Sequence, residues 1–153
     1  MTAAENIVTR PFEDEDESAV AALWREVFPD DPPWNEPSLV ITKKRAIQRE
    51  LLFVALSDNE IVGTAMGGYD GHRGWVYTVA VKPAHRRRGI GAALMVRVES
   101  ALAALGCLKL NLQIRSGNEA VLNFYERLGY AVERRTSMGK LLSPGTKYRI
   151  PSA

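Results

Sequence analysis

The chain contains 153 residues, of which 46% are hydrophobic and 25% are charged, and its formal net charge at pH 7 is +2. This length suits one domain with a full core, and so small a charge gives no support for nucleic-acid binding. The single cysteine, Cys107, excludes an internal disulfide and fits a reducing compartment. The N-terminus is polar and no apolar run reaches the length of a membrane span, so we expect a cytoplasmic protein with no membrane partner.

Apolar periodicity and turn residues predict the elements along the chain. In order they are a strand at 7–10, helices at 16–28 and from 37 or 38 to 49, a hairpin of strands at 51–56 and 60–66, a glycine-rich connection at 67–74, a strand at 75–81, a helix at 89–105, a strand at 108–114, a helix at 118–128, and one or two strands within 131–141. This order predicts an α/β fold with a mixed sheet. We expect a single domain over 1–153, with its core at about 7–141.

The most informative segment joins the strand at 75–81 to the helix at 89–105. A basic turn, 86–88, leads to Gly89 and Gly91 at the start of an Ala- and Leu-rich helix. The first N–H groups of a helix lack intrahelical partners, glycines let a phosphate approach them, and arginines add forked cationic donors. The segment therefore predicts a pyrophosphate site, the alternative being a basic, solvated turn. It lacks the third glycine of the dinucleotide-binding motif and the Gly-Lys-Ser/Thr of the Walker motif.

The second informative segment is the expected helix at 118–128. Four apolar residues recur at helical spacing and predict one buried face: Ala120, Val121, Phe124 and Leu128. Gly129 follows where a left-handed C-cap is expected. Tyr125 is predicted to turn off the buried face, where its hydroxyl is able to act as a general acid in a cleft, the alternative being a packing role.

The patterns Arg86-x-x-Gly89-x-Gly91 and Phe124-Tyr125-x-x-x-Gly129-Tyr130, with the order of elements, resemble the GNAT superfamily of N-acetyltransferases. The segments 33–35, 66–74 and 125–130 are similar to its bacterial YpeA-like branch. The resemblance implies a single-domain GNAT fold with a mixed, mostly antiparallel sheet of six to seven strands and about four helices. It also implies that the sheet is splayed at strands 75–81 and 108–114.

The resemblance further implies an enzyme that moves an acetyl group from acetyl-CoA directly to a primary amine, on a small molecule or on a protein N-terminus or lysine. The strand at 75–81 would carry a bulge whose backbone polarises the thioester carbonyl, and one arginine of 86–88 would meet the 3′-phosphate. Tyr125 would protonate the leaving thiolate. The residues implied in binding acetyl-CoA are Val79, Val81, Arg86, Arg87, Arg88, Gly89, Ile90, Gly91, Ala92, Asn118 and Tyr125. Strand alternation predicts Val79 and Val81 as core residues, on one face with Trp75 and Tyr77.

The general base is left open between Asp70 and His72, the ionisable residues of the glycine-rich connection. The alternatives are that Asp70 fixes the turn and that His72 is an exposed or hydrogen-bonding residue. Trp34, Asn35 and Glu36 are either acceptor-binding residues or the start of a helix, with Pro37 in its first turn.

The sequence also permits other functions and other binding partners. An acyl-CoA-binding sensor without turnover is the alternative function, favoured by the absence of a carboxylate at Trp75 and opposed by Tyr125. A nucleic-acid-binding module rests on the arginine run alone, so no nucleic-acid partner is expected. His72, His85 and Cys107 show no metal-ligand spacing, so no metal is expected. The resemblance also admits a homodimer.

Overall fold

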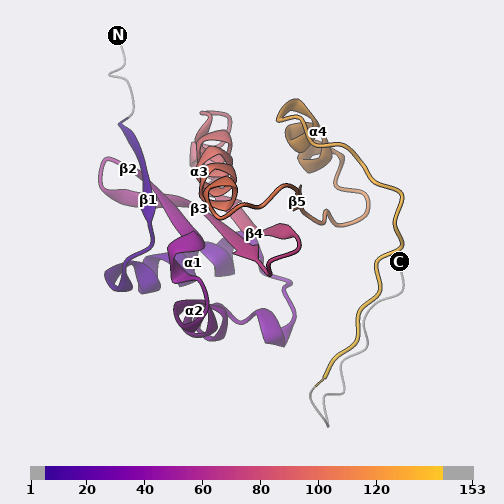
Figure 1. Ribbon diagram of the computed structural model, residues 1–153. Helices are drawn as coiled ribbons and strands as arrows, with labels where there is room; N and C mark the ends of the chain where they lie inside the picture. The colour runs from indigo at the N-terminus through magenta and orange to yellow at the C-terminus, as the bar shows by residue number, and fades with distance from the viewer. Residues whose placement is uncertain (1–5, 143–153) are drawn as a thin grey trace. The chain divides into compact units, whose positions relative to one another are not determined.

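The computed structural model describes residues 6–142. The chain divides into two compact units, Met1–Leu112 and Gln113–Ala153, and each is described by itself. The expectation of a single domain over 1–153 stays a prediction. Figure 1 shows the elements of both units.

The first unit holds a five-stranded sheet with the strand order β1-β2-β3-β4-β5. Neighbouring strands are antiparallel, except that β4 and β5 are parallel. Helices α1 and α2 cover one face and α3 covers the other (Figure 1). The elements are β1 (Ile7–Pro11), α1 (Glu17–Val27), α2 (Pro37–Ala46), β2 (Leu52–Ser57), β3 (Glu60–Tyr69), β4 (Gly74–Val81), α3 (Ile90–Ala104) and β5 (Leu110–Asn111). The α/β class and the mixed, mostly antiparallel sheet are therefore confirmed.

Two glycines of β3 let α3 pack closely on the sheet. A Cβ at Gly63 would lie 3.1 Å from side-chain atoms of Ile90 and Leu94, and one at Gly67 would lie 3.2 Å from Val98 Cγ1. Gly67 thus belongs to a strand and not to a connection. The glycine-rich connection expected at 67–74 is shorter than predicted, because β3 continues to Tyr69 and only 70–73 form the turn.

The strand β4 carries the bulge that the resemblance implied. Thr64 of β3 lies opposite Ala80 and Met66 lies opposite Tyr77, so Thr78 and Val79 of β4 face a single residue of β3. Thr78 has a φ of 48°, a conformation that is rare for a β-branched residue.

The bulge changes which side chains of β4 are buried. Gly74 faces α3, since a Cβ there would lie 3.2 Å from Leu102 Cδ1, whereas Ala80 belongs to the core cluster beneath α1. In a regular strand these two residues would share a face. The prediction that Val79 and Val81 are core residues, with Trp75 and Tyr77, is wrong: Tyr77 is exposed and the other three are half-buried.

The sheet is smaller than expected. Among residues 6–142 it has five strands rather than six or seven, and β5 spans Leu110–Asn111 rather than 108–114. β4 and β5 pair only through Gly74–Leu110 and Trp75–Asn111, and beyond these pairs β4 has no β5 partner, as the implied splay requires. The expected strands within 131–141 do not form, because the segment is exposed and strands need a pairing partner.

The second unit contains one helix, α4 (Glu119–Arg127), within its described residues. Asn118 Oδ1 accepts a hydrogen bond from the Val121 N–H at 3.4 Å and caps the N-terminus. Gly129 follows the C-terminal end of α4, and its φ of 93° confirms the expected left-handed cap. Tyr125, and not the expected apolar face, is the buried residue of the helix, and Ala120 is exposed.

Candidate active site

The loop between β4 and α3 presents backbone donors. A 3-10 turn (Pro83–His85) leads through 86–88 to Gly89, the N-cap of α3, with a φ of 78°. The first helical bond within this turn of α3 runs from the Ala93 N–H to the Gly89 carbonyl at 3.0 Å. The N–H groups of Ile90, Gly91 and Ala92 precede it, so they lie at the end of the helix where anions bind.

The three arginines of this loop are exposed. Arg86 Nε donates to the Val81 carbonyl at 3.2 Å, and Arg87 has a φ of 64°, which is strained for a residue with a side chain. No heavy atom lies within 4 Å of the position a Cβ would take on Gly89. Open space above the backbone and cationic side chains around it fit a pyrophosphate.

Side chains behind β4 hold the bulge. The Thr64 hydroxyl donates to the Thr78 carbonyl at 2.9 Å, and the Trp24 indole N–H donates to Thr64 Oγ1 at 2.8 Å. Thr64 is fully buried and Trp24 nearly so. The bulge is therefore fixed from the α1 side of the sheet rather than by its own residues.

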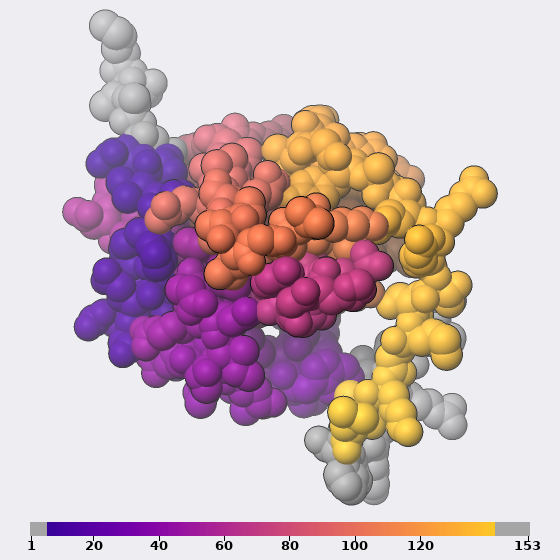
Figure 2. Space-filling view, viewed as in Figure 1, coloured from indigo at the N-terminus to yellow at the C-terminus, as the bar shows by residue number. Residues whose placement is uncertain are grey.

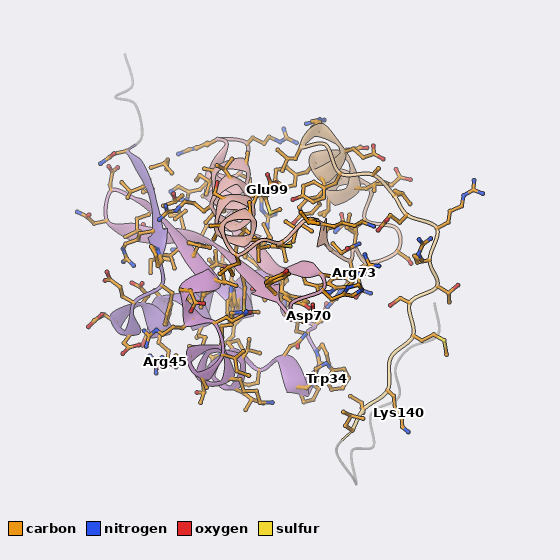
Figure 3. All side chains as sticks on the ribbon, in the orientation of Figure 1. Trp34, Arg45, Asp70, Arg73, Glu99 and Lys140 are labelled. Carbon is orange, nitrogen blue, oxygen red and sulfur yellow. The ribbon has the colours of Figure 1, made fainter. Side chains whose placement is uncertain are left out.

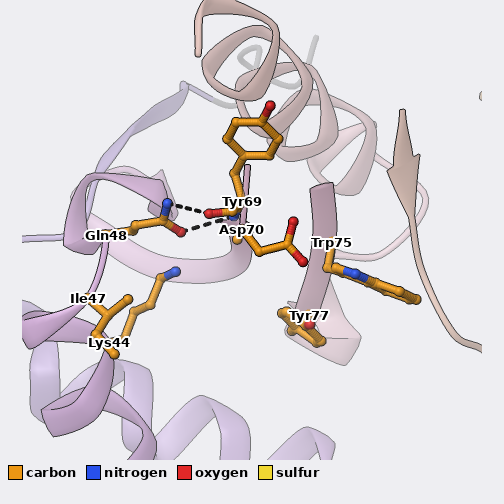
Figure 4. Close-up of a pocket in the computed structure, with 8 residues that line it drawn as sticks. Lys44, Ile47, Gln48, Tyr69, Asp70, Trp75 and Tyr77 are labelled. Carbon is orange, nitrogen blue, oxygen red and sulfur yellow. Dashed lines mark hydrogen bonds between the residues drawn. The ribbon is translucent and has the colours of Figure 1, made fainter. Parts of the chain in front are cut away.

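A cleft of about 500 Å³ lies between the C-terminal end of α2 on one side and the C-terminal end of β3 and the N-terminal part of β4 on the other. Figure 4 shows Lys44, Ile47 and Gln48 on one side, and Asp70 and the aromatic residues of β4 on the other. Figure 2 shows the surface hollowed between the purple atoms of the α2 region and the pink atoms of β4. The residues that line the cleft are Lys44, Ile47, Gln48, Gly68, Tyr69, Asp70, Trp75 and Tyr77.

Beyond Met66, β3 has no partner in β2. There, polar side chains from α2 and the residues after it bind the backbone of β3 instead. Lys44 Nζ donates to the Gly67 carbonyl at 2.6 Å. Gln48 Nε2 donates to the Tyr69 carbonyl at 2.7 Å, and Gln48 Oε1 accepts from the Tyr69 N–H at 3.0 Å (Figure 4). Hydrogen bonds therefore join the α2 side of the cleft directly to β3, the strand on its other side.

The ionisable groups of the cleft have shifted pKa values. Hydrogen bonds from the N–H groups of Arg73 and His72, each at 2.7 Å to Oδ1, lower the pKa of Asp70, which makes it a stable carboxylate but a weaker base. Burial lowers the pKa of Lys44. Burial and the charge of Asp70 raise the pKa of Tyr77, so its phenol stays protonated at neutral pH.

The other residues predicted near the acceptor lie in different places. His72 is exposed and is not among the residues that line the cleft. Glu36 is the N-cap of α2: its Oε2 accepts from the Leu39 N–H at 3.0 Å and its Oε1 pairs with Arg25 at 2.8 Å. Trp34 lies on the 3-10 turn before α2 (Figure 3). An acceptor contact by Trp34 or Asn35 stays a prediction.

In the second unit, Tyr125 is held by aromatic neighbours. Its ring meets Phe124 edge-on at 4.9 Å and Tyr130 at 5.7 Å between centroids. Burial raises the pKa of Tyr125 to about 12. The hydroxyl therefore carries its proton at neutral pH, as a general acid must.

Residues 17–130 match the model of the Acetyltransferase (GNAT) family. The chain is 42% identical over 141 residues to an acetyltransferase of Yersinia pestis (strain Pestoides F), an alignment that covers 91% of this chain and 98% of that one. An acetyltransferase of Yersinia pseudotuberculosis serotype I (strain IP32953) matches to the same extent. The chain belongs to the GNAT family of acetyltransferases, and its class is therefore that of an acyl-transferring enzyme.

Solved structures share the fold. The aminoglycoside N-acetyltransferase AAC(6')-Iy in complex with CoA has a TM-score of 0.75 at 17% identity and covers 94% of this chain and 99% of its own. The PaiA N-acetyltransferase from Thermoplasma acidophilum, in complex with coenzyme A, has a TM-score of 0.71 at 18% identity, covering 86% and 93%. At these identities the likeness concerns the fold alone.

Two further properties concern residues 6–142. None of the helices in this part of the chain has the length and apolar character that crossing a membrane requires. Nor do three or more His, Cys, Asp or Glu side chains gather there in a group suited to a metal ion.

Proposed function

We propose that the protein transfers an acetyl group from acetyl-CoA directly to a primary amine. The observation that carries the proposal is the order of features along β4: the cleft at Trp75 and Tyr77, then the bulge at Thr78–Val79, then the loop of backbone donors at 86–92. An amine in the cleft would meet, at the bulge, the acetyl thioester of a ligand whose pyrophosphate is bound at the loop. Acetyl-CoA supplies an activated thioester to this arrangement.

Each part of β4 and its loop has its own role. The N–H groups of Ile90, Gly91 and Ala92 bind the pyrophosphate, and an arginine of 86–88 meets the 3′-phosphate. The backbone of Val79, at the bulge, and of Val81, on the side of β4 that β5 does not pair, binds the pantetheine arm and stabilises the developing oxyanion. Asn118, whose Oδ1 caps α4, keeps its side-chain N–H₂ group for the coenzyme arm.

Tyr125 donates the proton that the departing thiolate needs. Its raised pKa, of about 12, keeps the hydroxyl protonated throughout the neutral range. The acceptor ammonium loses its proton before attack, through Asp70 or His72 directly or by way of water. The lowered pKa of Asp70 favours a role in binding the ammonium over a role as the sole base.

Isothermal titration with acetyl-CoA, followed by an amine screen that measures released CoA thiol, tests this function. Micromolar binding that Arg88→Glu with Gly89→Glu abolishes, together with turnover on an amine, is the expected result. Binding with no turnover on any amine would instead support the acyl-CoA sensor. No binding by the natural protein would contradict both functions.

A further inference from the structure

The cleft between α2 and β4 carries opposite charges on its two sides. Lys44 lies on the α2 side and Asp70 at the end of β3 (Figure 4). Among residues 6–142 neither side chain takes part in an ion pair, with the other or with a third residue. The charge of Glu50 acts on Lys44, but no ion pair within this part of the chain occupies the donors of its ammonium. A charged group that faces a cleft without an ion-pair contact is available to a charged ligand.

The Lys44 side presents an anion site. The ammonium has three donors, and the Gly67 carbonyl takes one of them at 2.6 Å. Burial has removed part of the water around Lys44, as the direction of its pKa shift indicates. A carboxylate placed against Lys44 would restore the lost solvation and use the free donors.

The Asp70 side presents a cation site. The N–H groups of His72 and Arg73 both bind Oδ1, which fixes the carboxylate and keeps it ionised, and these two bonds leave Oδ2 to other partners. Asp70 and Tyr77 both line the cleft on the side away from α2 (Figure 4). Burial and the charge of Asp70 raise the pKa of the Tyr77 phenol. Together the two side chains offer an ammonium one carboxylate oxygen and one hydroxyl.

Apolar surface joins the two sides. Trp75 and Tyr77 stack with their ring centroids 6.5 Å apart and their planes inclined by 19°, and Tyr77 is 49% exposed. Ile47, the C-cap of α2, is also exposed. A cleft of about 500 Å³ with such walls has the size of a site for a small molecule.

The orientation of a bound ligand follows from β4. Tyr77 immediately precedes the bulge residue Thr78, so the cation side adjoins the bulge. Lys44, on α2, lies on the other side of the cleft (Figure 4). A molecule with both charges would bind with its amine next to the reacting backbone.

We propose that the acceptor is a small amino-acid-type zwitterion, with its ammonium held by Asp70 and Tyr77 and its carboxylate held by Lys44. This rests on the proposed function. The acceptor ammonium releases one proton, its nitrogen forms the C–N bond to the acetyl carbon, and the C–S bond breaks. The nitrogen loses its second proton as the amide forms and the thiolate gains one, so the products are the N-acetyl amino acid, CoA thiol and one proton to solvent.

Matched sets of amines test the proposal. Each set has an amino acid, its carboxamide and its decarboxylated amine, for example phenylalanine, phenylalaninamide and 2-phenylethylamine, with parallel sets for aliphatic and polar side chains. We measure kcat/KM by thiol release, and binding of the same compounds to CoA-saturated protein by calorimetry. The expected result is that the acid of at least one set is preferred at least tenfold over its two partners.

Variants assign the preference to the cleft. Lys44→Met is expected to remove it by raising KM for the acid alone, whereas Lys43→Met, an equal loss of charge at an exposed position of α2, leaves it intact. Asp70→Asn is expected to weaken all three members of a set. Circular dichroism of each variant confirms folding.

The outcomes separate the two proposals. If acetyl-CoA does not bind, the proposed function fails. If acetyl-CoA binds but no set shows a preference for the acid in turnover or in binding, the zwitterion proposal is overturned and the proposed function stands. A preference that survives Lys44→Met, or acetylation confined to peptide N-termini or lysines, overturns it as well.

Discussion

Trp24 and Thr64, forty residues apart in the chain, are joined by a buried hydrogen bond of 2.8 Å from the indole N–H to the threonine hydroxyl. Trp24 is 3% exposed and Thr64 is fully buried. The same hydroxyl donates onward to the Thr78 carbonyl at 2.9 Å. The relay therefore links α1, through β3, to the bulge of β4.

Thr64→Val removes the middle of this relay while keeping the shape of the side chain. The Trp24 N–H and the Thr78 carbonyl lose their partner, and each unpaired group costs about 1–3 kcal/mol. We expect a lower free energy of unfolding in urea. Because the bulge loses its fixed position, we also expect kcat/KM for acetyl transfer to fall on the order of 10-fold or more.

Thr64→Ser is the matched control, since it keeps the hydroxyl. It is expected to keep most of the turnover although it loses a buried methyl group. Equal kcat/KM in Thr64→Val and the natural protein would show that the relay serves stability alone.

Tyr125→Phe tests the general acid. The ring and its edge contacts with Phe124 and Tyr130 are retained, so folding and acetyl-CoA affinity are expected to stay unchanged. The proton donor is lost, so kcat is expected to fall about 100-fold. Tyr130→Phe removes a hydroxyl from the neighbouring ring and serves as control. An unchanged kcat in Tyr125→Phe would assign the buried tyrosine to packing.

The positive φ of Gly89 is expected to matter for acetyl-CoA binding beyond its effect on stability. Gly89→Ala meets no heavy atom within 4 Å, so its cost is that of a side chain at a φ of 78°, about 1–2 kcal/mol. Gly106→Ala carries the same strain, with a φ of 87° and open space, after the C-terminus of α3. We expect similar losses of stability in denaturation but a weaker Kd for acetyl-CoA, by titration, in Gly89→Ala alone.

The ion pair between Arg10 and Asp16 is expected to make stability depend on pH. The guanidinium donates to both carboxylate oxygens, at 2.6 and 2.9 Å, and lowers the pKa of Asp16 below its ordinary 3.8. A lowered pKa gives stability that is present above the ordinary value and lost as the pH falls through the folded-state value. Asp16→Asn should therefore cost about 2 kcal/mol at pH 7 and progressively less below pH 4.

Urea unfolding at pH 7 and pH 3 measures this effect. Asp14→Asn is the control, because Asp14 pairs with Arg45 and Arg49 at the surface, where such pairs contribute about 0–1 kcal/mol. A cost of Asp16→Asn that is the same at both pH values would contradict the role of the charge.

The parts of the fold that the sequence predicted are those marked by local chemistry. Gly89 and Gly129 both adopt positive φ, one before α3 and one after α4. The bounds of α1, α3 and α4 were predicted to within one residue, whereas α2 ends at Ala46 rather than at 49. Glycine marks such positions because it alone adopts them without strain.

The parts that were missed depend on contacts between distant residues. Thr78 carries no sign of its positive φ, since a β-branched residue normally predicts regular strand, and the face of every later residue in β4 follows from that bulge. Lys44 is one of three consecutive basic residues, and its hydrogen bond to the Gly67 carbonyl and its place in the cleft, both made by distant residues, distinguish it from Lys43. The apolar residues within 131–141 suggested strands, but no partner strand pairs with them among the described residues.

The two hydrogen bonds between Gln48 and Tyr69 make the amide side chain a substitute for a peptide of a neighbouring strand. An unpaired stretch of strand backbone is a template on which another chain can add and aggregate. By occupying both the N–H and the carbonyl of Tyr69, Gln48 protects the sheet against such addition beside the very cleft that has to stay open. The protein thus keeps an open cleft next to β3 without exposing unpaired strand backbone on which another chain could add.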